Sequence, residues 1–212
     1  MKKFFFKLSL VLIPIFFVLF FYILIDPFKV IYKYDSYYES NKQSYIVLNR
    51  DFVSFETFIN NYPKYKYDSF IFGNSRSQFY KINTWKKYIN NRPCFHFDAF
   101  AESLYGIYVK IKYLNSNNIK IANALLVLDC AYLLERVTNS SGRLYLKHPE
   151  LSGQNKLDFQ FENFNAFLSL DFLILFWQHT IMGRVTPKIL DTNLFAYDLP
   201  TNEVRWDFLY YY

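Results

Sequence analysis

Short apolar runs alternate with amphipathic ones between residues 69 and 128, and this alternation predicts the core of the fold. Three runs are typical of buried strands, at Ser69–Phe72, Cys94–Phe97 and Ala124–Leu128. A helix is predicted between the second and third runs, where apolar residues recur at helical spacing: Leu104, Ile107, Tyr108, Ile111 and Leu114. A shorter helix is expected over Thr84–Ile89. This β-α-β-α-β order usually builds a parallel sheet with right-handed crossovers.

The predicted fold class is therefore α/β, with a three-layer, flavodoxin-like parallel sheet. Doubly wound sheets usually have five or more parallel strands, and only three are found here, so we expect a partial sheet. Phe164–Ile181 is strongly apolar but contains Asp171, Gln178 and His179, which favours a buried or amphipathic helix over a second membrane span. Around Leu199–Asn202, Pro and Asn indicate a turn between two short strands.

The N-terminus carries the strongest apolar signal. Leu8–Ile25 is a run of 18 residues without a charge, close to the roughly 20 residues that cross a bilayer. A cleaved signal peptide is the alternative, but Leu24–Tyr34 contains no Ala, Gly or Ser for a cleavage site. We expect a single-pass anchor in the cell membrane, with Met1-Lys2-Lys3 in the cytoplasm, although Lys29 and Lys33 lie on the other side. The predicted parts are an anchor (1–25), a connecting stalk with a short helix near 51–60 (26–67), and an extracytoplasmic α/β domain (68–212).

The charges argue against a nucleic-acid partner. The net charge is +6, but residues 1–33 hold five Lys and one Asp, whereas the remaining residues hold 19 basic and 17 acidic groups. A nucleic-acid-binding protein concentrates positive charge on its folded part. The two cysteines, Cys94 and Cys130, are expected to be separate core thiols, with a disulfide as the alternative that an exported domain permits. No Cys/His cluster is present, so neither a metal nor a cofactor is expected.

Polar groups follow each predicted strand. The Gly73-Asn74-Ser75-Arg76-Ser77 turn follows the first strand, Asp98 the second and Asp129 the third. Ligands of open parallel sheets bind outside the carboxyl ends of the strands. A Ser directly after such a strand can act as a nucleophile, and its own N–H can face the developing oxyanion. Ser75 is therefore the nucleophile candidate, and the oxyanion or cleft candidates are Gly73, Asn74, Arg76, Asp98 and Asp129.

Two simpler interpretations of these residues stay open. Ser75 or Ser77 could cap the following helix, as Ser commonly does. Asp98 and Asp129 could bind a divalent metal, but two carboxylates without a further ligand are more often a helix cap and a solvated strand end.

The segment Phe70-Ile71-Phe72-Gly73-Asn74-Ser75-Arg76-Ser77 resembles the first block of the SGNH/GDSL hydrolase superfamily. In that family a Gly-Asp-Ser or Gly-Ser/Asn-Ser turn follows the first strand, and its last Ser attacks an ester. Together with the anchor and the stalk, the chain resembles membrane-anchored members associated with O-acylation of surface polysaccharides. The resemblance covers roughly residues 68–135. It implies a serine esterase or O-acyltransferase that meets a surface polysaccharide or an acyl donor protein.

The chain departs from the family pattern in three places. No Gly stands at 98–101, where the family's second block would fall, and Asp129 replaces an Asn whose side chain donates to the oxyanion. The C-terminal Asp-x-x-His block, which supplies the base, is absent, and none of the three His has an Asp three residues before it. We therefore expect a truncated and inactive member, with a degenerate member as the alternative. A non-catalytic, membrane-anchored protein that assembles or binds surface glycans is the competing hypothesis.

Overall fold

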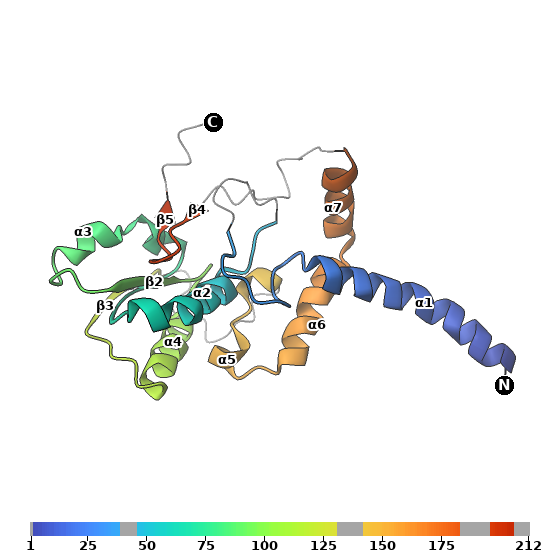
Figure 1. Cartoon of the computed structure of the whole chain (residues 1–212), viewed down its shortest axis with the longest axis horizontal. Helices are drawn as coiled ribbons and strands as arrows, with labels where there is room; N and C mark the ends of the chain where they lie inside the picture. Colours follow the sequence, from blue (N-terminus) through green and yellow to red (C-terminus); the bar gives the residue numbers. More distant parts are fainter. Residues whose placement is uncertain (1, 39–45, 131–141, 183–195, 206–212) are drawn as a thin grey trace.

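The computed structural model describes residues 2–38, 46–130, 142–182 and 196–205, with side chains from Leu12 onward except at 175, 177, 179–182 and 196. Its first element, α1 (Lys2–Ile25), projects away from the rest of the molecule (Figure 1). Across the described ranges, no helix combines the length and the apolar character that a membrane crossing requires.

The centre of the fold is a parallel sheet of three strands, β1 (Ser69–Gly73), β2 (Cys94–Asp98) and β3 (Asn123–Val127). Their order is β2-β1-β3, and Ile71 of β1 lies opposite His96 and Leu125. The predicted strands and their parallel pairing are confirmed, with each end within one residue. The chain is therefore an α/β protein.

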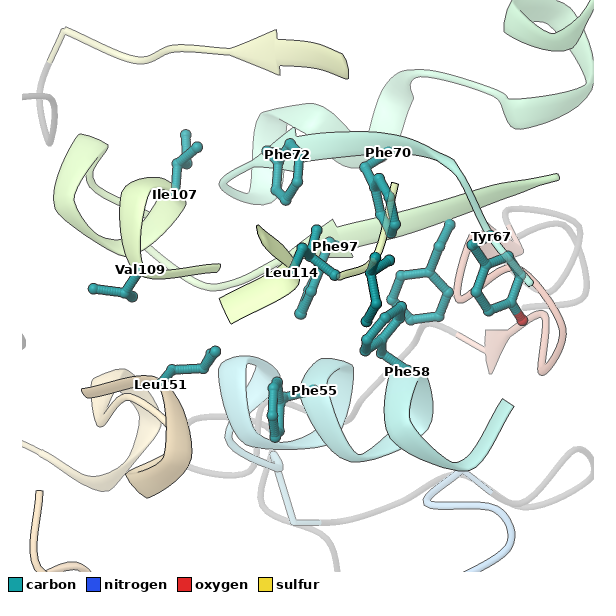
Figure 2. Packing of buried hydrophobic residues seen from close by; sticks show 12 residues of the cluster. Phe55, Phe58, Tyr67, Phe70, Phe72, Phe97, Ile107, Val109, Leu114 and Leu151 are labelled. Atoms are coloured by element: carbon teal, nitrogen blue, oxygen red, sulfur yellow. The ribbon is translucent and has the colours of Figure 1, made fainter. Parts of the chain in front are cut away.

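Alternation along β1 separates the two faces of the sheet. Phe70 and Phe72 face α2 (Arg50–Tyr65) and α4 (Leu104–Ser116), with Phe55 and Phe58 of α2 in the same cluster (Figure 2). Ile71 points to the other face, where Ile82 of α3 (Ile82–Lys86) covers it. Helices α3 and α4 confirm the two helices predicted between the strands.

Helix α2 begins and ends with clear local signals. Asn49 is its N-cap, and the Asn49 side chain accepts hydrogen bonds from the N–H groups of Asp51 and Phe52. The helix ends at Tyr65, and Lys66 follows as its C-cap with a left-handed φ of 50°. At 16 residues it is longer than the short helix predicted near 51–60. The segment predicted as a stalk thus supplies a helix that packs on the sheet.

The apolar segment predicted as one helix over Phe164–Ile181 is divided between two. A 3-10 turn, η2 (Arg143–Tyr145), and α5 (Pro149–Ser152) precede α6 (Lys156–Phe167) and α7 (Leu170–Met182). Between α6 and α7, the hydroxyl of Ser169 donates to the carbonyl of Ala166 and accepts from the N–H of Phe172. Ser169 therefore caps α7 and separates it from α6.

The predicted strand pair near the C-terminus is confirmed. Strands β4 (Ala196–Tyr197) and β5 (Val204–Arg205) pair antiparallel. The turn between them lies against the outer edge of β2, where the N–H of His96 donates to the carbonyl of Thr201 (2.9 Å) and Asn202 Nδ2 donates to the carbonyl of His96 (2.6 Å). The hairpin thus covers an edge that would otherwise expose unpaired backbone groups.

Both cysteines are free, but only one is a core thiol. Cys94 is buried on β2, and burial raises the pKa of its thiol to about 11. Cys130 is exposed after the end of β3, so the prediction that it belongs to the core is wrong. The reason is that β3 is an edge strand of the described sheet, with Leu126 and Leu128 also exposed.

Candidate functional site

The turn after β1 leads directly into a short 3-10 helix, η1 (Ser75–Phe79). Asn74 is its N-cap, and the Asn74 side-chain oxygen accepts from the N–H of Arg76 (2.9 Å). The buried Ser77 hydroxyl donates back to the carbonyl of Asn74 (2.7 Å). Neither serine side chain therefore caps this helix. Ser75 is exposed, and as the first residue of η1 its N–H has no acceptor within the helix.

Gly73 brings this turn close to the neighbouring strand. A Cβ at position 73 would lie 2.8 Å from the carbonyl oxygen of Val127 and 2.8 Å from the Cβ of Ser77. The first of these atoms is backbone and cannot rotate away. A glycine is required here because the ends of β1 and β3 approach each other so closely.

Asp129 comes directly after β3 and lies beside this turn. Its carboxylate accepts from Asn74 Nδ2 (3.0 Å) and pairs with Arg76 Nη1 (3.1 Å). The strand order β2-β1-β3 reverses between β1 and β3, and the crevice at such a reversal is where ligands bind in doubly wound sheets. The structure therefore brings four predicted residues, Asn74, Ser75, Arg76 and Asp129, to one edge of the sheet.

Asp98 is placed in a different environment from the other candidates. Its side chain is fully buried and bound by Arg50, with Nη2 2.7 Å from Oδ1 and Nε 3.1 Å from Oδ2. Gln78 Nε2 donates to Oδ2 as well (2.9 Å). Burial alone would raise the pKa of Asp98, but the Arg50 guanidinium outweighs it and holds that pKa below its usual value. Asp98 is thus an ionised partner of Arg50 inside the protein.

Arg50 is itself enclosed by polar and aromatic groups. Its guanidinium lies 3.7 Å from the ring centroid of Tyr197, and Nη2 donates to the carbonyl of Asn202 (3.0 Å). It therefore joins α2, β2 and the β4–β5 hairpin.

The two histidines with described side chains are engaged elsewhere. His96 is fully buried on β2, and burial lowers its pKa, which keeps the ring neutral at pH 7. His148 Nδ1 accepts from the N–H of Glu150 (3.2 Å), so Nε2 carries the proton and donates to Glu56 (3.1 Å). The side chain of His179 lies outside the described residues. Among those that are described, no imidazole forms a hydrogen bond with Ser75.

A second buried ionic group joins α2 to α4, and no pattern in the sequence predicted it. Lys147 Nζ binds Asp51 (2.9 Å) and Glu102, and Lys110 Nζ binds Asp51 (3.2 Å) and Glu102 as well. All four side chains are at most 5% exposed. Lys110 does not belong to the apolar stripe that predicted its helix, so periodicity did not indicate its burial. Its partners come from positions 8 to 59 residues away, which local periodicity does not reveal.

Comparisons of this chain with protein-family models, with curated proteins and with solved structures find no match.

Proposed function

We propose that the turn after β1 is the nucleophile platform of a membrane-anchored, extracytoplasmic SGNH/GDSL-like protein, an esterase or O-acyltransferase for surface polysaccharide. One observation carries the proposal: Ser75 is exposed at the carboxyl edge of β1 while Asn74 performs the capping. The strand order β2-β1-β3 matches the start of a flavodoxin-like sheet, which supports a partial fold of that class.

The chemistry proposed for this turn is acyl transfer. Ser75 Oγ attacks the carbonyl carbon of an ester while a base takes its proton, and the N–H of Ser75 faces the oxygen that becomes negative. The ester C–O bond then breaks, the alcohol leaves with the proton from the base, and the acyl group on Ser75 passes to water or to a sugar hydroxyl. Ionised Asp129 accepts hydrogen bonds and cannot stabilise that oxygen. The described residues thus provide a nucleophile and one donor, but they place no base beside Ser75.

We expect the 212-residue chain to hydrolyse an activated acetyl ester at the background rate, because general-base assistance is worth about 10²- to 10⁴-fold. Added imidazole can replace such a base. With imidazole present, Ser75 should become acetylated faster than Ser116, an exposed serine on α4 that serves as an internal control. Peptide mass spectrometry of the acetylated chain, alongside Ser75→Ala, measures both sites.

The outcomes separate the two functional classes. Preferential acetylation of Ser75 supports the nucleophile platform, and fast turnover without imidazole that Ser75→Ala abolishes would show that a base of this chain reaches the site. Equal acetylation of Ser75 and Ser116 would instead favour the competing hypothesis, a non-catalytic glycan-binding protein. A pocket bordered by Lys81, Asn83 and Thr201 offers polar groups for that role, and it contains none of the predicted site residues.

The membrane anchor is part of the same proposal. It is supported by the uncharged run Leu8–Ile25 and by the exposure of large apolar side chains on α1, such as Phe16 (63%), Phe17 (69%) and Phe20 (63%). A helix in water rarely exposes so many large apolar side chains, whereas a lipid environment favours them.

Carbonate extraction of membranes should leave the full chain in the pellet. Protease added from outside should digest the α/β domain that follows α1, because the proposed orientation places this domain outside the cytoplasm. Recovery of a soluble form that begins after residue 25 would contradict the uncleaved anchor.

A further inference from the structure

Helices α6 and α7 expose a set of large apolar side chains close to the end of α1. The set, which we name the α6–α7 stripe, consists of Leu157 (76% exposed), Phe161 (62%), Leu168 (42%), Leu170 (72%) and Ile174 (46%). Large apolar side chains gathered on exposed helix faces often mark an interaction site.

Each helix carries its share of the stripe on one side. At 3.6 residues per turn, Leu157 and Phe161 lie within about 40° of each other around the α6 axis, and Leu168 falls between them. The buried side of α6 carries Phe159 and Phe167, while Asp158 and Glu162 occupy another side. Helix α6 therefore has two apolar sides, one in the protein core and one exposed.

Aromatic contacts fix both helices to the end of α1. Tyr22 of α1 contacts Phe164 and Phe167 of α6, with ring centroids 5.2 and 5.1 Å apart, and Phe21 contacts Phe176 of α7 at 6.5 Å. Figure 1 shows α6 and α7 on opposite sides of this end, both running across the direction of α1.

The chain that leaves α1 is held rigidly. The buried carboxylate of Asp26 accepts from the N–H groups of Val30 (2.9 Å), Ile31 (3.1 Å) and Tyr32 (3.1 Å) and from the hydroxyl of Tyr34 (3.0 Å). The Phe28 ring also contacts Phe172 of α7 (4.9 Å). These contacts fix how α6 and α7 are oriented relative to α1.

We propose that α6 and α7 lie flat on the outer face of the cell membrane, where α1 leaves the bilayer. The α6–α7 stripe is then inserted at the boundary between the lipid headgroups and the acyl chains. This inference rests on the proposed anchor. A lipid surface is the occupant that fits, because the stripe flanks α1 at the end of its exposed apolar side chains, which continue as far as Leu24 (65% exposed). Helices with one exposed apolar side and one polar side bind membranes in this way.

The arrangement has a consequence for the Ser75 site. A domain held by α1 alone could rotate about a single attachment, whereas two helices in the membrane plane add further contacts. The domain would therefore keep one orientation, with the carboxyl edge of the sheet at a constant height above the lipid.

Nitroxide labels on the full chain in phosphatidylcholine–phosphatidylglycerol vesicles test the proposal. Cys130→Ser removes the exposed thiol, and Cys94 is buried. Single cysteines are then introduced by Phe161→Cys and Ile174→Cys, with Phe20→Cys as the control for the anchor and Tyr88→Cys, at an 81% exposed position, as the control for water. Frequent collisions of a label with oxygen, which concentrates in the bilayer, show that the label lies in lipid. Frequent collisions with a water-soluble nickel chelate show that it lies in water.

The labels at 161 and 174 should collide mainly with oxygen, as the label at 20 should, whereas the label at 88 should collide mainly with the nickel chelate. If they resemble 88 while 20 reports lipid, the inference is overturned and the anchor remains. If 20 also reports water, the anchor fails and the inference fails with it. Shielding of 161 and 174 from both reagents would show a protein contact, such as a second copy of the chain, and would overturn the assignment to lipid.

Discussion

Arg50→Met is expected to lower the free energy of unfolding by about 3–5 kcal/mol, which is the usual cost of removing one partner of a buried ion pair. Methionine retains much of the side-chain volume but leaves the Asp98 carboxylate buried without its cation. The carbonyl of Asn202 and the ring of Tyr197 lose their contacts with the guanidinium at the same time. Urea unfolding of the detergent-solubilised chain, followed by tryptophan fluorescence, measures the loss.

Arg92→Met is the matched control. Arg92 also pairs with an aspartate, Asp68, but its side chain is 39% exposed, so water replaces the lost partner. Its unfolding midpoint should therefore change far less than that of Arg50→Met. Equal shifts for the two variants would show that the burial of the Arg50–Asp98 pair does not determine its effect.

Glu102→Gln is expected to lower the free energy of unfolding by a similar amount, about 3–5 kcal/mol. This variant leaves a buried positive charge without its partner, whereas Arg50→Met leaves a buried negative charge. Asp51, Glu102, Lys110 and Lys147 are balanced in charge, and the substitution leaves two buried ammonium groups with one carboxylate. Glutamine has almost the same shape as glutamate, so the change tests charge and not volume. Glu162→Gln on the exposed side of α6 is the control and should leave the midpoint nearly unchanged.

The pH dependence of this variant distinguishes charge from general damage. Burial by itself lowers the pKa of Lys147, but in the natural chain Asp51 and Glu102 outweigh it and raise that pKa above its usual value. The stability that this raised pKa contributes is fully present below the pKa of Lys147 in the unfolded chain. It is lost as the pH rises through the pKa of Lys147 in the folded chain. In Glu102→Gln the excess positive charge should instead place one lysine pKa below its unfolded value of about 10.4.

Between about pH 8 and 10 the unfolded variant then binds more protons than the folded one, so its stability should rise with pH. The natural chain should show no such rise. If the free energy of unfolding changed with pH in the same way for the two proteins, the electrostatic explanation would be contradicted. This holds even if the loss of stability at pH 7 had the predicted size.

Local signals in the sequence were sufficient for the sheet and its helices. The strand at Ser69–Gly73 is a continuous apolar run that ends at a glycine, and the helix at Leu104–Ser116 repeats apolar residues at its own period. Both patterns arise from the geometry of one element and need no distant partner. The Ser75 turn was found for the same reason, since it depends only on the residues that follow one strand.

The tertiary structure alone decided which polar residues meet. Asp98 ends its strand much as Asp129 does, and the sequence placed both at the cleft. Arg50, 48 residues earlier, binds Asp98 inside the protein, while Asp129 meets the Ser75 turn. Which carboxylate stays beside the turn depends on where the helix that carries Arg50 packs, and no pattern around Asp98 contains that information.

The same division holds for the apolar residues of the C-terminal half. Their sequence predicted a helical segment, because periodicity reports that part of the surface is apolar. It does not report what covers each side, so the exposure of Leu157, Phe161 and Leu170 was left undetermined. That exposure depends on how the helices pack, with Tyr22 of α1 against α6 and Phe28 against α7, and such contacts exist only once distant segments have packed together.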